Sequence, residues 1–475
     1  MLTLGDVLTG TKGWIAWPWP GDDVSRDIVF TAIVIDSRQV VSGALFFALP
    51  GTAMDGHEFL GDAAAHGAQC AVVSEVWLQQ RTHTPNPPPL PVIAVPETLI
   101  ALHDLAAWWR GRFPNTPVVG ITGSVGKTSA KEAIAAVLGT RYRVVKTPGN
   151  FNAITSMPLV LLDITAETEV AVIEMSLYDP GDIATMTRIA APTIGVVTTI
   201  GMSHVERLGS QAAIIRNKGD LIAGLPADGV AVLNGDDREA RRMQFRSEAR
   251  CYMYGTLPIN LIRATEVTSR GLDGIAFDLH LPGASPRAVI SPMLGTHNVY
   301  AALSAATVGY VLDLTPEEIA RGLAGQQERL RLTTAPGPNG ATLIDDTYNS
   351  SPQSAIAALD LLASLDARRR VAVLADMFEL GDYSAEAYEI VGTHAAKTAD
   401  VLYAFGPRSV ATAEAARMAG MPADAVVSIA ADDKDALAAR LRAELAPGDL
   451  VLVKGSRGMH MDELIAALRV DGGTA

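Results

Sequence analysis

The residues best suited to chemistry form a short glycine-containing loop between an apolar strand and a helix. The segment Val118-Val-Gly-Ile-Thr leads into Gly123-Ser-Val-Gly, and a helical pattern begins near Lys127. Glycines let backbone N–H groups approach phosphate oxygens, and the first turn of a helix adds partial positive charge. We expect Lys127 to reach the terminal phosphates of a nucleotide and the Thr128 hydroxyl to ligate Mg2+.

This loop is shorter than the common Walker pattern GxxxxGK[ST], whose first glycine would stand at the position of Ile121. A plain strand–helix turn with a surface lysine is the alternative interpretation. Two glycines, a lysine and a threonine between a strand and a helix nevertheless favour a nucleotide-phosphate site. Its expected residues are Thr122, Gly123, Ser124, Val125, Gly126, Lys127 and Thr128.

Other polar residues follow apolar strands, and ligands collect beyond the carboxyl ends of strands in an α/β sheet. The strand from Val170 ends in Glu174, whose carboxylate could hold Mg2+ beside the phosphate loop. A capping or salt-bridging glutamate is the alternative. The strand from Ile194 leads to His204, although a lone histidine in a loop is more often structural or solvated.

Two further positions are ambiguous from the residues alone. Lys218 falls within a helical pattern, where a lysine normally lies on the solvated face. A strand from Thr342 runs into a polar cluster that contains Asp346 and Asn349. Asp, Asn and Ser favour turns, but adjacent aspartates after a strand also suggest recognition of a cation or a hydroxyl group.

The elements that position these residues alternate between strand and helix. Short β-branched runs predict buried strands at residues 71–74, 118–122, 170–174, 194–199, 230–234 and 371–375. Amphipathic stretches such as 129–138 and 355–362 lie between them. This alternation predicts an α/β protein with mostly parallel sheets.

The length of 475 residues corresponds to roughly three domains. Phe113-Pro-Asn-Thr-Pro and Ala335-Pro-Gly-Pro-Asn-Gly supply the boundary cues, and the proline-rich run at 84–91 is interpreted as a surface loop. The predicted domains are 1–115, 116–330 and 331–475.

Composition narrows the function classes. Hydrophobic residues make up 48% and the net charge is −14, which indicates a globular chain and argues against a general nucleic-acid binder. The two cysteines, Cys70 and Cys251, suggest neither a disulfide framework nor a zinc site. The start lacks the pattern of a signal peptide, and no apolar run is long enough for a membrane span. We therefore expect a soluble cytoplasmic protein.

Taken together, the motifs resemble the Mur ligase family, the ATP-dependent amide ligases that build the peptidoglycan stem peptide. The resemblance covers nearly the whole chain and follows the order of the family. It implies a small N-terminal α/β uridine-nucleotide domain, a central phosphate-loop domain and a C-terminal Rossmann-like domain. The matching segments are Thr122-Gly-Ser-Val-Gly-Lys-Thr, Gly149-Asn-Phe-Asn, Glu174-Met-Ser, Thr199-Ile-Gly-Met-Ser-His, Asn217-Lys-Gly-Asp, Gly295-Thr-His-Asn and Asp345-Asp-Thr-Tyr-Asn.

Within the family, the chain looks most like the ligase that adds D-alanyl-D-alanine to UDP-N-acetylmuramoyl-tripeptide. The segments in favour are Asp36-Ser-Arg-Gln-Val, Asp376-Met-Phe-Glu-Leu-Gly and Val453-Lys-Gly-Ser-Arg, and the Asp-Asn-Pro-Arg motif of diaminopimelate-adding ligases is absent. Both lysine and diaminopimelate fit as the third residue of the tripeptide. The alternatives are the tripeptide ligase, a folylpolyglutamate synthetase, or a phosphate-loop ATPase that switches a partner.

The resemblance implies that the tripeptide carboxylate attacks the γ-phosphate of ATP and that the dipeptide amine then attacks the acyl phosphate. It makes Lys127, His204 and Lys218 catalytic, with two Mg2+ ions held by Thr128, Glu174 and His204. Lys218 matches a position that family members carbamylate with CO2, which would give the lysine a carboxylate-like group.

The resemblance also implies the remaining ligand contacts. Asn298 would lie near the adenine, and Arg329 and Asp346 would reach the ribose or the phosphates, with Tyr348 and Asn349 close by. We further expect a monomer whose third domain closes onto ATP. The UDP-sugar and muramoyl-peptide contacts would be Ser37, Arg38, Asn150 and Asn152, the last two being turn formers in the alternative interpretation.

Overall fold

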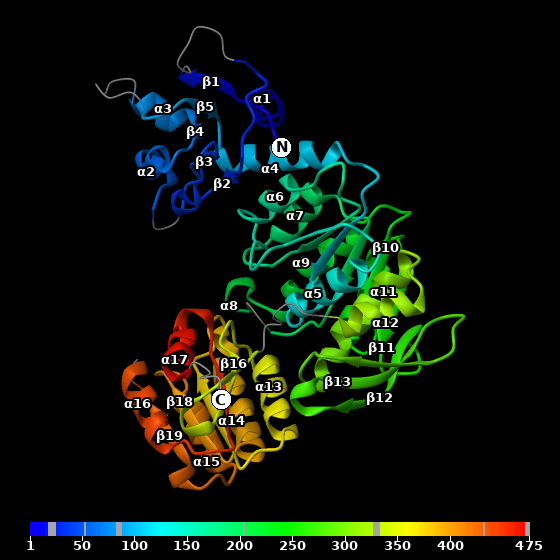
Figure 1. The fold of residues 1–475 in the computed structure, drawn as a ribbon, viewed down its shortest axis with the longest axis vertical. Helices are drawn as coiled ribbons and strands as arrows, with labels where there is room; N and C mark the ends of the chain where they lie inside the picture. The colour runs from blue at the N-terminus through cyan, green and yellow to red at the C-terminus, as the bar shows by residue number, and fades with distance from the viewer. Residues whose placement is uncertain are drawn as a thin grey trace.

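The computed structural model describes residues 1–17, 25–51, 54–81, 88–202, 205–325, 333–430 and 433–470. Within them, sheets of five, nine and six strands follow one another along the chain, each with helices packed against it (Figure 1). This arrangement confirms the predicted α/β class with mostly parallel sheets.

The first sheet has the strand order β1-β5-β4-β3-β2, in which only β1 runs antiparallel to its neighbour. Its strands are β1 (Trp14–Trp17), β2 (Ile33–Val34), β3 (Leu45–Phe47), β4 (Cys70–Ser74) and β5 (Val92–Val95). The helices of this part are α1 (Leu4–Thr11), α2 (Leu60–Ala65), α3 (Glu75–Arg81) and α4 (Thr98–Gly111).

Helix α4 fastens the first sheet to the middle part of the chain, because it lies across α6 (Met157–Leu162) and α7 (Asp182–Ala190) (Figure 1). Its side chains donate hydrogen bonds to carbonyl oxygens of the middle part. Trp109 Nε1 lies 2.9 Å from the oxygen of Ile164, and Arg110 Nε lies 3.1 Å from that of Ala190. These contacts are buried, so they fix the position of the helix in a low-dielectric environment.

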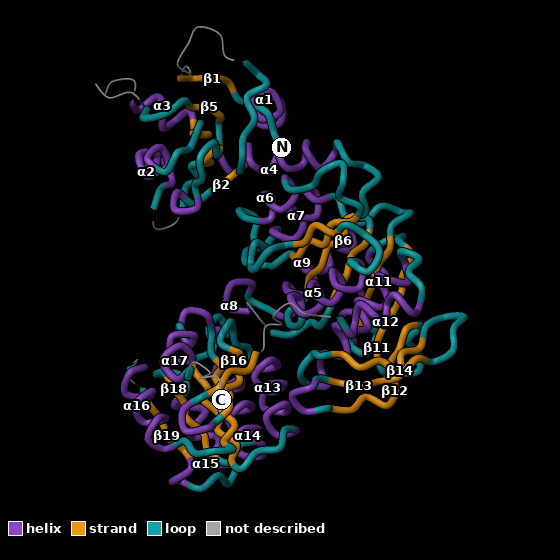
Figure 2. Tube along the Cα trace, viewed as in Figure 1, coloured by secondary structure: helices purple, strands orange, loops and turns teal. Residues whose placement is uncertain are grey.

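The middle sheet has the order β14-β13-β12-β11-β10-β9-β6-β8-β7. Strands β7 to β12 and β6 are parallel, and β12, β13 and β14 form an antiparallel meander that continues the sheet away from β6 (Figure 2). The strands are β6 (Val118–Thr122), β7 (Val144–Lys146), β8 (Val170–Glu174), β9 (Ile194–Val197), β10 (Val230–Asn234), β11 (Arg250–Gly255), β12 (Ile262–Ser269), β13 (Ile275–His280) and β14 (Arg287–Ser291).

Helices cover both faces of the middle sheet, and alternate residues of each strand enter different cores. Val119 and Ile121 pack with α5 and α11, whereas Ala171 and Ile173 pack with α6 and α7. Burial on both faces explains the nearly continuous apolar strands of the sequence. The remaining helices are α5 (Lys127–Leu138), α8 (Val205–Leu208), α9 (Gln211–Ala223), α10 (Arg238–Arg242), α11 (Val299–Val311) and α12 (Pro316–Ala324).

The C-terminal sheet has the order β15-β16-β20-β17-β18-β19, and only β15 is antiparallel to its neighbour. Helices α13, α14 and α15 cover one face, and α16 and α17 cover the other. The elements are β15 (Thr333–Pro336), β16 (Thr342–Asp346), α13 (Pro352–Ser364), β17 (Arg369–Ala375), α14 (Ser384–Thr398), β18 (Val401–Phe405), α15 (Val410–Met418), β19 (Val426–Ile429), α16 (Lys434–Glu444), β20 (Asp449–Lys454) and α17 (Met461–Leu468).

The structure corrects one detail of the sequence-based prediction. Ala335 and Pro336 belong to strand β15 and not to a turn, because they pair with Leu343 and Thr342 across an antiparallel hairpin. Residues 84–87 of the proline-rich loop and the predicted boundary at residue 330 lie outside the described residues. No helix in the described ranges is both long and apolar enough to cross a bilayer.

Candidate functional site

The phosphate loop connects the buried strand β6 to helix α5, as predicted. Gly123 and Gly126 have φ values of 151° and 85°, which suit glycine. A Cβ at Gly123 would lie 1.9 Å from Thr198 Oγ1, so only glycine fits between the two loops. Thr198 also donates a hydrogen bond of 2.7 Å to the carbonyl of Val125, which holds the loop from the side.

Two lysine side chains converge on one carbonyl oxygen of this loop. Nζ of Lys127 and Nζ of Lys218 lie 2.9 Å and 2.8 Å from the oxygen of Gly123. Lys218 is fully buried on α9, which rules out the alternative interpretation of a lysine on a solvated helix face. Burial lowers the pKa of the Lys218 ammonium well below its usual range, and the nearby charge of Lys127 lowers it further. The site therefore brings two lysine side chains, one of them with a lowered pKa, to the same carbonyl oxygen of the loop.

Glu174 ends strand β8 next to the start of α5. Its Oε1 accepts hydrogen bonds from Thr128 Oγ1 at 3.2 Å and from Asn152 Nδ2 at 2.8 Å. Its Oε2 is buried and has no hydrogen-bond partner among the described residues. A carboxylate and a hydroxyl group in contact, with one carboxylate oxygen left over, form a donor set that suits Mg2+.

A buried pair of charges lies beneath this donor set. Lys131 Nζ is 2.8 Å from Glu132 Oε1 and 3.9 Å from Glu174 Oε2. Lys146 Nζ bonds the other oxygen of Glu132 at 2.7 Å. Sequence reasoning missed Lys131, although its spacing of three residues from Thr128 predicts that both lie on one helix face.

The predicted muramoyl-peptide contacts lie in the loop after β7. The side chain of Asn152 donates a hydrogen bond to Glu174. The backbone carbonyl of Asn150 accepts a 2.7 Å hydrogen bond from the amide of Asn152. A cavity of about 260 Å3 opens between this loop and the first sheet. Its wall includes Phe151 from the loop and Gln39 from the 3-10 helix after β2, so it joins the two predicted substrate segments.

Ser37 and Arg38 form a short 3-10 helix after β2, apart from the phosphate loop. Ser37 is buried. Arg38 is exposed and makes two bonds to Asp36, 2.9 Å from Nε to Oδ1 and 2.7 Å from Nη2 to Oδ2. This pairing lowers the pKa of the Asp36 carboxyl group, chiefly through the side-chain hydrogen bond. To bind a diphosphate, the Arg38 guanidinium group would have to break its hydrogen bonds to Asp36 or contact both groups at once.

Asp346 ends strand β16 and forms a buried ion pair with Lys454, which ends the neighbouring strand β20. Lys454 Nζ lies 2.6 Å from Asp346 Oδ2 and 2.9 Å from the carbonyl of Asn349. Sequence reasoning missed this partner, although the segment Val453-Lys-Gly-Ser-Arg was already singled out. The tip of Tyr348 is partly exposed, and its ring lies beneath Arg457.

Asn298 belongs to a short 3-10 helix before α11, and its Nδ2 donates a 2.7 Å bond to the carbonyl of Leu294. Burial lowers the pKa of the adjacent His297 imidazole, and the carboxylate of Asp346 partly opposes this shift. The structure thus brings the Asn298 segment close to Asp346, across the junction of the middle and C-terminal parts. The predicted site residues His204 and Arg329 lie outside the described residues.

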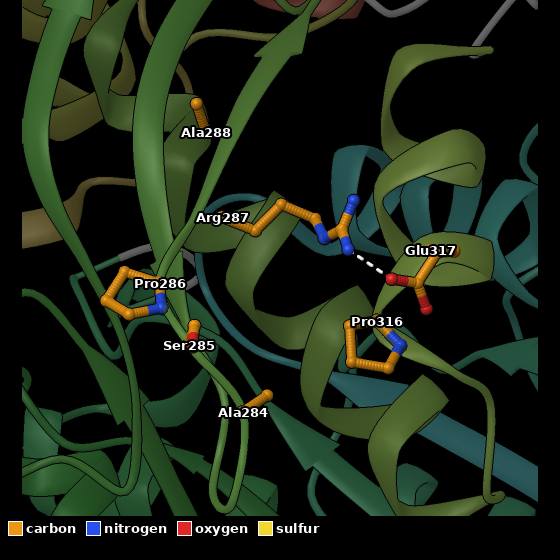
Figure 3. Close-up of a pocket in the computed structure, with 7 residues that line it drawn as sticks. All are labelled: Ala284, Ser285, Pro286, Arg287, Ala288, Pro316 and Glu317. Atoms are coloured by element: carbon orange, nitrogen blue, oxygen red, sulfur yellow. Dashed lines mark hydrogen bonds and ion pairs between the residues drawn. The ribbon is translucent and has the colours of Figure 1, made fainter.

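A larger surface pocket of about 510 Å3 lies away from these residues, between the β13–β14 turn and α12 (Figure 3). It is lined by Ala284, Ser285, Pro286, Arg287, Ala288, Pro316 and Glu317, and Arg287 pairs with Glu317. Its single carboxylate, Glu317, is paired with Arg287, so the strand ends of the middle sheet remain the better candidate site.

Comparisons with known proteins agree with this arrangement. Residues 29–109 match the catalytic domain of the Mur ligase family, residues 121–309 match the Mur ligase middle domain, and residues 328–457 match the Mur ligase glutamate ligase domain. The matched regions include strands of all three sheets.

The chain is 35% identical to the UDP-N-acetylmuramoyl-tripeptide–D-alanyl-D-alanine ligase of Bacillus subtilis, over 98% of each chain. A crystal structure of MurF from Acinetobacter baumannii is similar with a TM-score of 0.83, at 26% identity and 98% coverage of both chains. The MurF ligase of Thermotoga maritima in complex with ADP is similar with a TM-score of 0.77 and 26% identity, covering 93% of this chain and 97% of that one.

Proposed function

Because the chain belongs to the Mur ligase family, we propose that it joins D-alanyl-D-alanine to UDP-N-acetylmuramoyl-tripeptide, with conversion of ATP to ADP and phosphate. The observation that carries this proposal is the arrangement around Gly123, where Lys127 and the buried Lys218 converge on one carbonyl oxygen near the Thr128–Glu174 pair. A simple ATPase switch needs no buried second lysine at this position.

The proposed reaction has two steps. An oxygen of the tripeptide carboxylate attacks the γ-phosphorus of ATP, and the bond to the bridging oxygen of ADP breaks, giving an acyl phosphate. The amine of the dipeptide then attacks the acyl carbon, and the tetrahedral intermediate expels phosphate and loses a proton. Phosphoryl transfer depends mainly on positioning and charge stabilisation. Lys127, which bonds Gly123 in the absence of ligand, would turn to the β- and γ-phosphates.

Mg2+ fits the residues that are present. The Thr128 hydroxyl and the Glu174 carboxylate would hold one ion, for which Oε2 of Glu174 is available because it has no hydrogen-bond partner among the described residues. Bound Mg2+ would supply positive charge to the phosphate oxygens. The family resemblance adds His204 as a ligand of a second ion.

Lys218 is proposed to react with CO2 to form a carbamate, with release of one proton. Only the neutral amine is nucleophilic, and the burial that lowers the pKa of Lys218 favours this form. The resulting anion would be attracted to the ammonium group of Lys127, which bonds the same carbonyl oxygen. Low activity of a Lys218→Ala variant, partly restored by formate or acetate, would support the carbamate, and full activity of that variant would exclude it.

The UDP-linked substrate is proposed to span the first two domains. Ser37 and Arg38 would contact the UDP-sugar, and Asn150 and Asn152 would line the muramoyl-peptide path. The cavity between Gln39 and Phe151 supports this path, because it connects the two segments. Its wall also contains Asp163, whose carboxyl pKa is raised by burial.

The C-terminal domain is proposed to close over the nucleotide. Asn298 would contact the adenine, while Arg329 and Asp346 would reach the ribose or the phosphates, with Tyr348 and Asn349 nearby. We propose domains of 1–115, 116–330 and 331–475, which keep each described sheet within one domain. A monomer in the cytoplasm, where ATP and UDP-linked precursors are available, would suffice for this reaction.

The test is phosphate release from ATP with UDP-N-acetylmuramoyl-tripeptide, measured with and without D-alanyl-D-alanine, together with the mass of the product. Release that depends on both substrates, with a product heavier by the dipeptide, would support the ligase. Release without either substrate would favour a switch-type ATPase. Release only with other amino-acid or folate acceptors would assign the chain to another branch of the family.

A further inference from the structure

Arginines and aromatic rings alternate along the carboxyl edge of the C-terminal sheet. In the strand order β16, β20, β17 and β18, the loops after the strands carry Tyr348, Arg457, Phe378 and Arg408. The guanidinium carbon of Arg457 lies 5.7 Å from the centre of the Tyr348 ring, and that of Arg408 lies 5.3 Å from the centre of the Phe378 ring. Such stacking orients a guanidinium group without neutralising its charge.

Hydrogen bonds join the loop after β17 to the loop after β20. Ser456 Oγ accepts a 2.8 Å bond from the amide of Phe378, and the amide of Ser456 donates a 3.0 Å bond to the carbonyl of Asp376. A Cβ at Gly458 would lie 2.9 Å from Phe378 Cε2, so the chain after Arg457 packs directly against that ring. The backbone around Arg457 is therefore held before any ligand binds.

Both arginines are exposed, and neither forms an ion pair with a carboxylate in the part of the chain that the structure describes. Other arginines of the same sheet do form such pairs: Arg369 bonds Asp449 at 2.6 Å. The planar guanidinium group matches a carboxylate through two parallel hydrogen bonds. The edge thus offers oriented positive charge to an anionic ligand.

This edge faces the middle domain. The carbonyl of Glu379, in the loop after β17, accepts a 3.3 Å bond from the amide of Glu206 in α8. The side chain of Gln353, at the start of α13, packs against Gly201 in the loop after β9. A ligand bound at the edge would therefore lie between the C-terminal sheet and the loops next to the phosphate site.

We propose that Arg457 binds the terminal carboxylate of the dipeptide acceptor and so directs its free amine toward the acyl phosphate. This inference rests on the proposed function, which supplies a ligand with one carboxylate and one amine. Arg457 is assigned because its strand lies directly beside β16, which carries Asp346 and Tyr348. Arg408 stacks in the same way but lies two strands further along the sheet, so it serves as a matched control.

The experiment compares D-alanyl-D-alanine with D-alanyl-D-alanine amide, which has the same amine but no terminal charge. Steady-state KM values for both acceptors are measured with the full chain and with Arg457→Gln, Arg457→Lys and Arg408→Gln. A hydrogen bond to a charged group accounts for a change of about ten- to a hundredfold in affinity. We expect Arg457→Gln to raise the KM of the dipeptide by this factor and to leave that of the amide within threefold.

The first half-reaction is followed separately, by trapping the acyl phosphate with hydroxylamine in the absence of any acceptor. An unchanged trapping rate in Arg457→Gln would show that the variant is folded and binds ATP and the tripeptide substrate. We expect Arg457→Lys to lie between the wild type and Arg457→Gln, because it keeps the charge but loses the second hydrogen bond.

Three outcomes would overturn the inference while the ligase itself stands. These are an unchanged preference for the carboxylate in Arg457→Gln, an equal loss in Arg408→Gln, and a raised KM for ATP or the tripeptide substrate in place of the acceptor. A wild-type chain that forms no trapped hydroxamate and no amide product would instead remove the proposed function and this inference with it.

Discussion

The carboxyl edges of the middle and C-terminal sheets each bury a lysine, in opposite electrostatic settings. Lys218 is fully buried against the Gly123 carbonyl and beside the positive charge of Lys127. Lys454 is almost as buried, but its Nζ lies 2.6 Å from the Asp346 carboxylate. Burial without a counter-charge favours the neutral amine, whereas burial with one retains the ammonium group.

The difference separates reactive from structural groups. In the middle domain, Lys218 has no counter-charge and Glu174 Oε2 has no hydrogen-bond partner among the described residues. Such groups can gain an interaction when a ligand binds or the side chain is modified. In the C-terminal sheet, Lys454 joins β16 to β20 and leaves recognition to the exposed Arg457 above it. Substitutions that remove a counter-charge or a buried lysine test this difference between the two domains.

The largest effect is expected from Asp346→Asn, which leaves the Lys454 ammonium group buried without its counter-charge. Removing one partner of a buried ion pair costs about 3–5 kcal/mol. We expect the free energy of unfolding of the C-terminal domain to fall by this amount, measured by urea titration of the full chain. The double variant Asp346→Leu/Lys454→Met should recover most of the loss, and a loss in the double variant as large as in Asp346→Asn would contradict the electrostatic explanation.

Glu174→Gln should reduce activity more than stability, because the nearest cation, Lys131, lies 3.9 Å from Glu174 Oε2 and keeps a closer ion pair of 2.8 Å with Glu132. Loss of a charged group from a phosphoryl-transfer site lowers kcat by about 10²–10³-fold. The measurement is kcat as a function of Mg2+ concentration, with thermal unfolding alongside. Glu169→Gln, at an exposed position of the same domain, is the control. A kcat within threefold of the wild type at saturating Mg2+ would remove Glu174 from the metal site.

Features that depend on contiguous residues could be predicted from the sequence, and features that depend on packing between distant segments could not. Strands such as Val118–Thr122 and Val170–Glu174 were predicted at their observed bounds, because burial on both faces leaves a continuous apolar run. The phosphate loop was predictable because its glycines, lysine and threonine are contiguous. The burial of Lys218 and the pairing of Lys454 with Asp346 were not, since they arise from packing between segments far apart in the chain.

Lys218→Met should stabilise the middle domain while abolishing the proposed carbamate. Because the pKa of Lys218 is lowered on folding, the unfolded chain binds the extra proton at every pH between the lowered pKa and 10.5. The stability of the wild type therefore rises with pH across that interval. At pH 7 we expect Met to raise Tm by about 2–4 °C, equivalent to about 1 kcal/mol. This advantage should shrink toward pH 10.

Lys397→Met is the control for this comparison, because Lys397 lies exposed on α14 and should show neither the gain in Tm nor its pH dependence. A Tm of Lys218→Met below that of the wild type at pH 7, in air depleted of CO2, would mean that the ammonium form is stabilised in the folded chain. The contrast between the two buried lysines would then fail.

The smallest effect on stability is expected at the contact between the middle and C-terminal domains. Arg207 of α8 stacks on the Tyr178 ring, with its guanidinium carbon 3.7 Å from the ring centre, and its Nε lies 3.7 Å from Glu379 Oε1 of the C-terminal domain. The side chains of Arg207 and Glu379 are 39% and 32% exposed, so solvent and salt screen the pair. Glu379→Gln should cost less than about 1 kcal/mol in the free energy of unfolding.

The consequence of Glu379→Gln should instead be visible in the domain arrangement, because the Arg207–Glu379 ion pair spans the middle and C-terminal domains while Tyr178 keeps Arg207 in place. Small-angle scattering without substrates should show a slightly larger radius of gyration for this variant at low salt, and the same value as the wild type at 0.5 M salt. Arg242→Gln, which removes an ion pair within α10, should leave the radius unchanged. Equal radii for Glu379→Gln and the wild type at low salt would show that backbone contacts such as Glu206 N to the Glu379 carbonyl suffice to hold the domains together.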